Sequence, residues 1–190
     1  MANEGQAITL DAHNHGKMMD YLHTTRFQAR DICIYLLTIK SGMRIGSVAG
    51  LMLEDVINSD GSLKEVVVIR RSITKGAKKI TAYLSHTEVK EDLENYLKER
   101  GNKRVENLFV SQKGGAFSPN SLSQLMLKHY NNAGIEGASS HSGRRTAITN
   151  WLKNGGDIVA VSKLAGHSSV LTTQRYVHHN QEELMSLVSQ

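Results

Sequence analysis

Apolar residues recur at helical spacing through most of the chain, and this pattern predicts a mainly helical protein. A first helix is expected over residues 11–24, with Leu22 on its inner face. Thr25-x-x-Gln28 has the form of a capping box and is expected to open a second helix. Apolar side chains surround the axis of that helix almost completely, so we expect it to be buried and Gly42 to end it.

Only the middle of the chain has the composition and alternation of β-strands. Residues 54–57, 65–73 and 79–84 are rich in β-branched or alternating apolar residues, and turns are expected at 58–61 and 75–77. We predict a three-stranded antiparallel sheet here. The fold class is therefore α+β, a helical bundle with one small sheet.

Later helices are expected where a capping residue precedes a periodic apolar pattern. Ser85-x-x-Glu88 predicts one such helix, which Gly101 ends, and Ser118-Pro119 predicts another. Short helices complete the chain, and they are expected over residues 142–152, 157–165, 172–178 and 181–188.

Composition adds three limits. The 190 residues fit one domain, 1–190, and the net charge of +5 favours a polyanionic partner. The single cysteine, Cys33, excludes an internal disulfide and is expected in the core. The sequence has no membrane span and no export signal, so a cytoplasmic protein, associated with a bacterial or phage-host nucleoid, is expected.

Two arginines are candidates for holding a phosphate, because a guanidinium presents paired donors and stays charged. Arg44 lies just past the buried helix in Gly-Met-Arg-Ile, and Arg144 lies three residues after His141. Taken singly, either arginine is more typical of an ordinary surface charge. Arg145 competes with Arg144, but the spacing to His141 favours Arg144.

Three further residues complete the candidate chemistry. Tyr176 lies nine residues after His167, in the stretch Leu-Ala-Gly-His-Ser-Ser followed by Thr-Thr-Gln-Arg-Tyr-Val-His. Lys75 lies at the predicted hairpin turn, in Thr-Lys-Gly-Ala-Lys-Lys, where Lys78 and Lys79 are rivals for the same role. A tyrosine taken alone is most often a packing residue, so the residues around Tyr176 decide how it is interpreted.

In order along the chain, these motifs resemble those of the tyrosine recombinase (phage integrase) catalytic domain, and the resemblance extends from Ile8 nearly to the C-terminus. It implies that Tyr176 attacks a DNA phosphodiester and forms a 3′-phosphotyrosyl link, which a partner strand then resolves. It also implies catalytic roles for six residues and no metal, ATP or other cofactor. The six are Arg44, Lys75, His141, Arg144, His167 and Tyr176.

Within this resemblance, Arg44, Arg144 and His167 hold the phosphate, and Lys75 and His141 move protons. The family usually has an acidic residue three positions after the first arginine, but this chain has Ser47. The separate N-terminal DNA-clamping domain of typical members is expected to be absent. Arg145 is expected to contact the DNA backbone or solvent.

Double-stranded DNA is the expected partner. Family members act as tetramers on DNA, so a homotetramer is expected there, whereas the state in free solution is left open. The amphipathic tail after Gln181 can pass to a neighbouring protomer or fold back on its own core. A metal site at His13-x-His15 or His178-His179 is rejected, because neither pair has further ligands at suitable spacing.

Two alternative functions share this fold. One is a nicking and resealing enzyme of the type IB topoisomerase kind, which uses the same chemistry as a monomer. The other is a DNA-binding regulator that has lost catalysis. The presence of all six candidate residues argues against the second.

Overall fold

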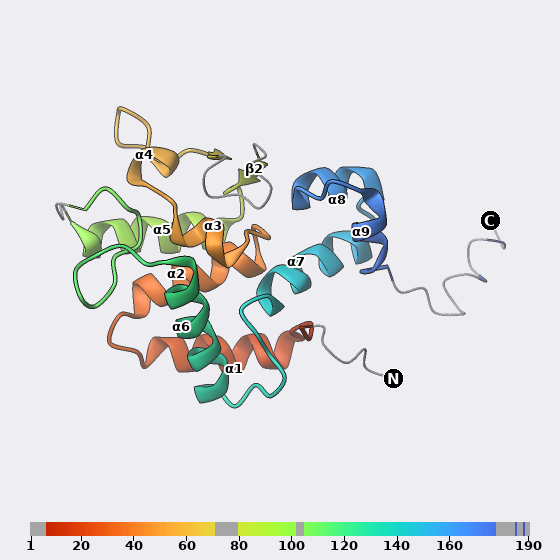
Figure 1. Cartoon of the computed structure of the whole chain (residues 1–190), viewed down its shortest axis with the longest axis horizontal. Coiled ribbons are helices and arrows are strands. Elements are labelled where there is room, and N and C mark those ends of the chain that lie inside the picture. The colour runs from red at the N-terminus through yellow and green to blue at the C-terminus, as the bar shows by residue number, and fades with distance from the viewer. Residues whose placement is uncertain (1–6, 71–79, 102–104, 178–184, 186–187, 189–190) are drawn as a thin grey trace.

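The computed structural model describes residues 7–70, 80–101, 105–177, 185 and 188. Its elements are α1 (Ala12–His23), α2 (Gln28–Ile39), α3 (Ile45–Ala49), α4 (Leu53–Val56), β1 (Val66–Ile69), β2 (Ile80–Tyr83), α5 (Thr87–Arg100), α6 (Pro119–Asn132), α7 (Ser142–Lys153), α8 (Ile158–Ala165) and α9 (Val170–Gln174). Helices dominate, with a small antiparallel sheet at one side, as the sequence predicts (Figure 1). In the described ranges, the helices are too short or too polar to cross a bilayer.

Helix α2 is the centre of the fold. It packs against α1, α3, α5 and α7, and Figure 1 shows it crossing the molecule between α1 and α5. Its residues Ile34, Leu36 and Leu37 have no exposed surface, because neighbouring helices cover every side of the axis. The predicted buried helix is confirmed, and Cys33 is buried within it.

The predicted helix starts are partly right. Asp11 caps α1 by accepting a hydrogen bond from the Asn14 N–H at 2.7 Å, and Ser118 caps α6. The capping box at Thr25 is wrong, because the Thr25 hydroxyl donates to the Leu22 carbonyl at 2.8 Å, at the end of α1. Helix α2 instead begins after Phe27 without a side-chain cap.

The start predicted for α5 is also wrong by one residue. His86, and not Ser85, is the N-cap of this helix, and it makes no side-chain capping hydrogen bond. Glu88 does not close a capping box because its carboxylate accepts from the Lys40 ammonium at 3.1 Å, which ties α5 to the end of α2. Gly101 ends the helix as predicted.

The sheet has two strands within the described residues. Strands β1 and β2 pair antiparallel in the register Ile69↔Ile80. The third predicted strand, 54–57, lies mostly in α4, because the Asp55 carboxylate accepts the Met52 N–H at 2.8 Å and closes a helical turn. Ile57 keeps only an isolated bridge to Leu63.

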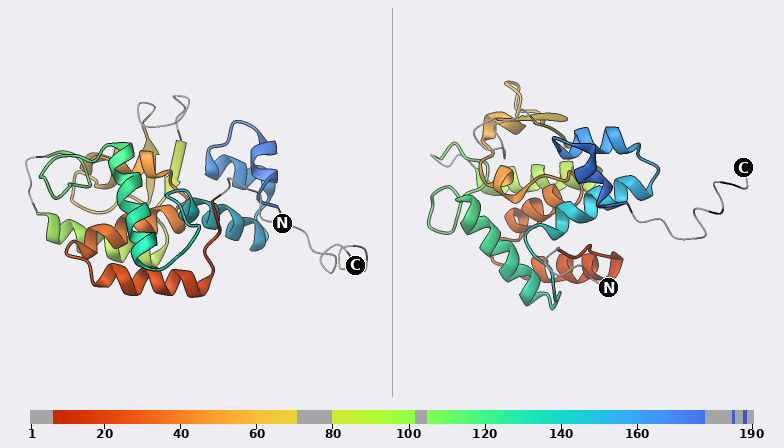
Figure 2. Two further views of the ribbon diagram at one scale, coloured as in Figure 1. Left: turned by 60° about the horizontal axis from the view of Figure 1, so that its bottom comes forward. Right: turned by 45° about the vertical axis from the view of Figure 1, so that its right-hand side comes forward.

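The last three helices form the side of the molecule opposite α5. Helix α8 packs on α7, α9 and β2, and Figure 2 shows it beside the strands. The helix predicted over residues 172–178 is present but has other bounds, because α9 covers Val170–Gln174 and Tyr176 lies beyond its end. The helix predicted over 181–188 falls almost entirely outside the described residues.

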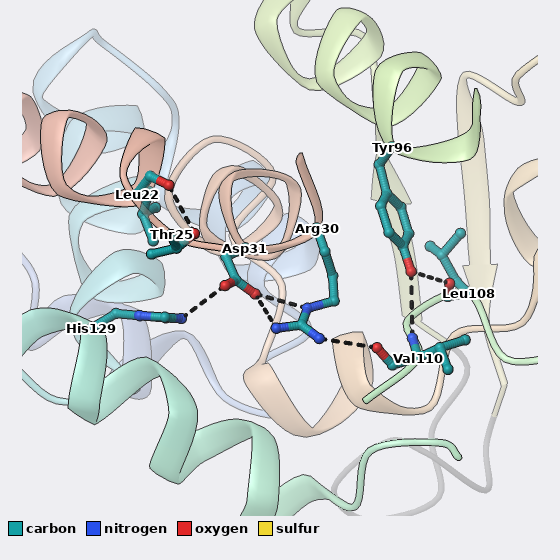
Figure 3. Close-up of polar contacts among 8 residues, drawn as sticks. All are labelled: Leu22, Thr25, Arg30, Asp31, Tyr96, Leu108, Val110 and His129. Atoms are coloured by element: carbon teal, nitrogen blue, oxygen red, sulfur yellow. Dashed lines mark hydrogen bonds and ion pairs between the residues drawn. The ribbon is translucent and has the colours of Figure 1, made fainter. Parts of the chain in front are cut away.

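A buried ion cluster joins α2 to α6 and to the loop before α6 (Figure 3). Arg30 donates from Nε to the Asp31 carboxylate at 2.8 Å and from a terminal nitrogen to the Val110 carbonyl at 3.1 Å. The other Asp31 oxygen lies 3.3 Å from His129 Nε2. Removing one partner would leave a buried charge without compensation, so the cluster resists disruption. Its Arg30 contact with the Val110 carbonyl thereby holds the loop against α2.

Helices α2 and α7 approach closely at Gly143. A Cβ on Gly143 would overlap the Thr38 hydroxyl, and it would lie 3.0 Å from the Thr38 Cβ and 3.4 Å from the Ile39 nitrogen. Because backbone and a β-branched side chain cannot move aside easily, only glycine fits here. The next residue is Arg144, so this contact sets where Arg144 enters the site.

We predict that Gly143→Ala lowers the free energy of unfolding by about 1–3 kcal/mol, through overpacking between α2 and α7. Gly16→Ala in α1 is the matched control, since no atom lies within 4 Å of its added Cβ. That control should gain up to about 1 kcal/mol from helix propensity. Urea unfolding of both variants measures the difference, and equal stabilities would contradict the close approach.

Candidate active site

Five of the six candidate residues line one open cleft of ≈ 460 Å³. The cleft lies between α7, the turn that joins α2 to α3, and the segment from the end of α8 to the residues after α9. Its lining residues are Ala7, Arg44, Ser139, His141, Arg144, Arg145, His167, Thr172, Arg175 and Tyr176. The sixth candidate, Lys75, and its rivals Lys78 and Lys79 lie outside the described residues.

Arg144 is the most buried of these side chains, with 8% of its surface exposed. Its guanidinium donates to the Gly42 carbonyl at 2.5 Å and to the Ala165 carbonyl at 2.5 Å. One terminal nitrogen also lies 3.3 Å from His167 Nε2. Burial and the charge of Arg44 lower the pKa of Arg144 to about 9, which leaves it charged at neutral pH.

Arg44 reaches the cleft because the chain turns sharply after α2. Gly42 has φ +63° and lies against the Trp151 ring, and the Met43 N–H donates to the Leu37 carbonyl at 3.1 Å. Arg44 then caps α3 through its backbone, and its half-buried side chain lines the cleft with Arg144. Within the described part of the chain, this guanidinium makes no hydrogen bond, so its donors can serve an anion.

His167 follows the left-handed Gly166, which ends α8 at φ 61°. A Cβ on Gly166 would lie 2.7 Å from Ile80 of β2, so glycine is required both for the turn and for the packing. The Nδ1 atom of His167 lies 2.8 Å from the Thr173 hydroxyl. Burial, Arg144 and Arg44 together lower the pKa of His167 to about 4.

Tyr176 lies in the turn after α9, where its N–H donates to the Thr173 carbonyl at 3.0 Å. Its ring stacks on the His167 ring at 5.9 Å between centroids and 19° between planes. The Arg145 guanidinium lies over the Tyr176 ring, 5.4 Å from its centroid. The Tyr176 phenol is therefore half-buried, contacts both of these side chains and lines the same cleft as the arginines.

His141 and Ser47 occupy different surroundings. His141 is the exposed N-cap of α7, at the edge of the cleft, one turn from Arg144. Ser47 is buried in α3, where its N–H donates to the Arg44 carbonyl at 2.8 Å. The position that is usually acidic in this family therefore carries a neutral hydroxyl beside the start of α3.

Two contacts in the cleft were not predicted from the sequence. The Arg145 guanidinium lies over the Tyr176 ring, and its expected contact with the DNA backbone or solvent stays a prediction. Thr173 was only part of a motif, yet it is fully buried and contacts both His167 and Tyr176. The motif Thr-Gln-Arg-Tyr carries no local signal of those contacts, which depend on how α8 and α9 pack.

The described residues contain no group of three or more histidine, cysteine, aspartate or glutamate side chains suited to a metal ion. His15 has a different use, because its Nδ1 lies 2.9 Å from the buried Tyr35 hydroxyl and the two rings stack. His178 and His179 lie outside the described residues.

Comparisons with known proteins agree with this arrangement. Residues 9–183 match the phage integrase family. The tyrosine recombinase XerC of Caldanaerobacter subterraneus subsp. tengcongensis is 32% identical over 169 residues, which cover 86% of this chain and 45% of that protein. The chain spans about half the length of the curated relatives it matches.

Solved structures show the same fold. The crystal structure of XerA recombinase matches 100% of this chain and 65% of its own, with a TM-score of 0.78 and 25% identity. XerH site-specific recombinase, bound to palindromic difH substrate in a post-cleavage complex, matches 98% of this chain and 55% of its own, with a TM-score of 0.74 and 23% identity. The chain belongs to the phage integrase family and has the fold of a tyrosine recombinase catalytic domain.

We predict that His167 titrates at about 4 in the DNA-free protein, far below its ordinary value of 6.5, because two arginines and burial oppose its charged form. An unfolded histidine binds a proton at higher pH than folded His167 does. The stability of the folded state should therefore fall as pH drops from 6.5 towards 4. NMR titration, with His167→Gln to assign the signal, measures the pKa directly.

His167→Gln is also the control for the stability measurement. Without His167, the free energy of unfolding should change less as the pH drops from 6.5 towards 4. Inorganic phosphate in the cleft should raise the pKa of His167, since its negative charge opposes the two arginines. A His167 that titrates near 6.5 with or without phosphate would contradict the arrangement.

Proposed function

We propose that this chain is the catalytic domain of a site-specific DNA recombinase that cleaves and religates strands through a 3′-phosphotyrosyl intermediate. The observation that carries the proposal is the convergence of Arg44, Arg144 and His167 around Tyr176 in one cleft. These residues come from three separate segments of the chain. Together they can hold a backbone phosphate and provide a phenolic oxygen to attack it.

In the proposed reaction, the phenolic oxygen of Tyr176 forms a bond to phosphorus while the bond from phosphorus to the 5′ oxygen breaks. The phenol loses its proton, and the departing 5′ oxygen gains one. A 5′ hydroxyl from the partner strand then attacks the same phosphorus and releases Tyr176. Because each bond formed replaces an equivalent ester bond, neither step requires ATP.

Charge on the phosphate oxygens increases in the five-coordinate transition state, and fixed donors there lower the barrier. Arg144 suits this role because two carbonyls hold its guanidinium in place before any ligand arrives. Arg44 adds a second guanidinium whose donors face the cleft. With two cations provided by the protein, the proposed chemistry requires no divalent metal.

Proton transfer is assigned to Lys75 and His141. His141 lies at the exposed edge of the cleft, within the same turn of α7 as Arg144, where it can exchange a proton with the phenol. Lys75 is assigned as the donor to the 5′ oxygen from its place in the family motif alone, since it lies outside the described residues.

Double-stranded DNA is the proposed substrate, and a homotetramer on DNA is the proposed active assembly. The net charge of +5 favours association with a polyanion, and three further cationic or polar side chains surround the candidate nucleophile: Arg145, Arg175 and Thr172. Recombination between two duplexes needs four nucleophiles, one for each strand that is cut.

Covalent trapping tests the proposed nucleophile. A pool of nicked duplexes with randomised sequence is incubated with the protein, and DNA that stays attached under denaturing conditions is recovered and sequenced. We expect the adduct with the native chain and none with Tyr176→Phe, which lacks the attacking oxygen. Tyr83→Phe is the control, because Tyr83 is an exposed tyrosine of β2 outside the cleft.

An adduct that persists in Tyr176→Phe would overturn the assignment. Binding without an adduct in the native chain would favour a non-catalytic regulator. Relaxation of supercoiled DNA without exchange between two recovered sites would favour a nicking and resealing enzyme.

Arg144→Lys tests the phosphate clamp. Lysine keeps the charge, but its single nitrogen cannot reproduce the planar guanidinium, which bonds to the Gly42 and Ala165 carbonyls through two separate nitrogens and keeps further N–H groups for a phosphate. We expect adduct formation to slow by roughly 10²–10³-fold, as when one transition-state donor is lost. Arg144→Ala is less informative, since it also leaves two carbonyls without their donor. A rate for Arg144→Lys near that of the native chain would contradict a role for the guanidinium.

A further inference from the structure

One residue contacts both the phosphate-binding histidine and the candidate nucleophile. Thr173 in α9 has no exposed surface, and its hydroxyl lies 2.8 Å from His167 Nδ1. Its carbonyl accepts the Tyr176 N–H at 3.0 Å. A buried hydroxyl needs a hydrogen-bond partner, so the contact with His167 holds the ring as well as satisfying the threonine.

The other ring nitrogen of His167 faces a group that can only donate. Nε2 lies 3.3 Å from a terminal nitrogen of Arg144, and a guanidinium has no acceptor. Nε2 must therefore offer its lone pair to Arg144. In a neutral imidazole, the proton is then on Nδ1, and the Nδ1–H donates to the Thr173 hydroxyl.

We propose that Thr173 is a positioning residue that holds His167 in the Nδ1–H tautomer, with Nε2 directed at Arg144 and the cleft. The role of Thr173 in catalysis rests on the proposed function. The tautomer of His167, in contrast, is a property of the DNA-free protein. Thr173 acts through His167, and it also anchors the backbone of the turn that carries Tyr176.

The arrangement prepares His167 for a phosphate. Burial and the two arginines hold the pKa of His167 down, and the negative charge of a phosphate oxygen that enters beside Arg144 offsets the effect of the arginines. A proton taken up from water then resides on Nε2, and this Nε2–H donates to the phosphate oxygen. Nδ1–H stays bonded to the Thr173 hydroxyl throughout, while the Arg144 N–H that Nε2 accepted in the free protein turns to the phosphate.

Removing the hydroxyl should release this constraint. Without an acceptor at Nδ1, the half-buried ring gains nothing from keeping its proton there, and rotation about its side-chain bonds can place either nitrogen towards Arg144. The stacked contact with Tyr176, at 5.9 Å, depends on the same ring orientation. Both the hydrogen-bond donor to phosphate and the surroundings of the nucleophile would change together.

Thr173→Val and Thr173→Ser test the proposal. Valine keeps the branched shape and removes the hydroxyl, whereas serine keeps the hydroxyl. Thr149→Val is the matched control, because Thr149 is a buried threonine of α7 outside the cleft. Thermal unfolding of each variant separates loss of folding from loss of positioning.

The first measurement uses the free protein without DNA. Nitrogen-15 NMR of the His167 side chain distinguishes the two tautomers, and we expect Nδ1–H in the native chain, in Thr173→Ser and in Thr149→Val. Thr173→Val should show Nε2–H or a mixture. Nε2–H in the native chain, or an unchanged tautomer in Thr173→Val, would overturn the proposal. The measurement on the native chain decides this even if Thr173→Val does not fold.

The second measurement is single-turnover adduct formation on the DNA recovered by trapping. We expect Thr173→Val to slow it about 10- to 100-fold, as loss of an orienting hydrogen bond does for metal-bound histidines, with DNA affinity changed by no more than about twofold. Thr173→Ser should restore most of the rate. An unchanged rate in Thr173→Val would contradict the positioning role. A native chain that has Nδ1–H but forms no adduct would instead count against the proposed function and leave the tautomer assignment standing.

Discussion

The guanidinium of Arg144 connects the three segments from which the cleft is built. It extends from α7 and donates to the carbonyl of Gly42, before α3, and to that of Ala165, at the end of α8. Helix ends and turns leave carbonyls without partners, and the buried arginine satisfies one of each here, Ala165 at the end of α8 and Gly42 in the turn before α3. The same contacts that stabilise the packing of these segments also fix the direction of the guanidinium, so fold and site depend on one side chain.

The cleft brings the positive charges of Arg44 and Arg144 close together. Burial and the charge of Arg44 lower the pKa of Arg144, and burial together with both arginines lowers the pKa of His167 to about 4. Mutual repulsion of this kind costs stability in the free protein and is relieved by an anion. The site is thus complementary to a phosphate before it binds one, which agrees with catalysis by preorganised charges.

Glycine packing gives these charges their positions. Gly143 lets α7 lie directly on Thr38 of α2, Gly42 turns the chain beside Trp151, and Gly166 turns it beside Ile80. At each place, a side chain would collide with a neighbour, and two of the three have positive φ. A buried ion cluster of Arg30, Asp31 and His129 performs the corresponding task on the other side of α2, where it holds α6 and the loop before it.

Local pattern determined much of this protein, because helical periodicity and capping depend on residues close in sequence. It predicted the buried α2 and the starts of α1 near Asp11 and of α6 after Ser118, whereas the candidate residues of the cleft came from the resemblance to tyrosine recombinases. It failed where one local hydrogen bond replaced another, as when the Thr25 hydroxyl bonded back to Leu22 at the end of α1 and Asp55 closed a turn in place of a strand. Only the tertiary structure decided that the Thr173 hydroxyl contacts His167 and that Arg145 lies over Tyr176, because those contacts depend on how α7, α8 and α9 pack, which no local pattern specifies.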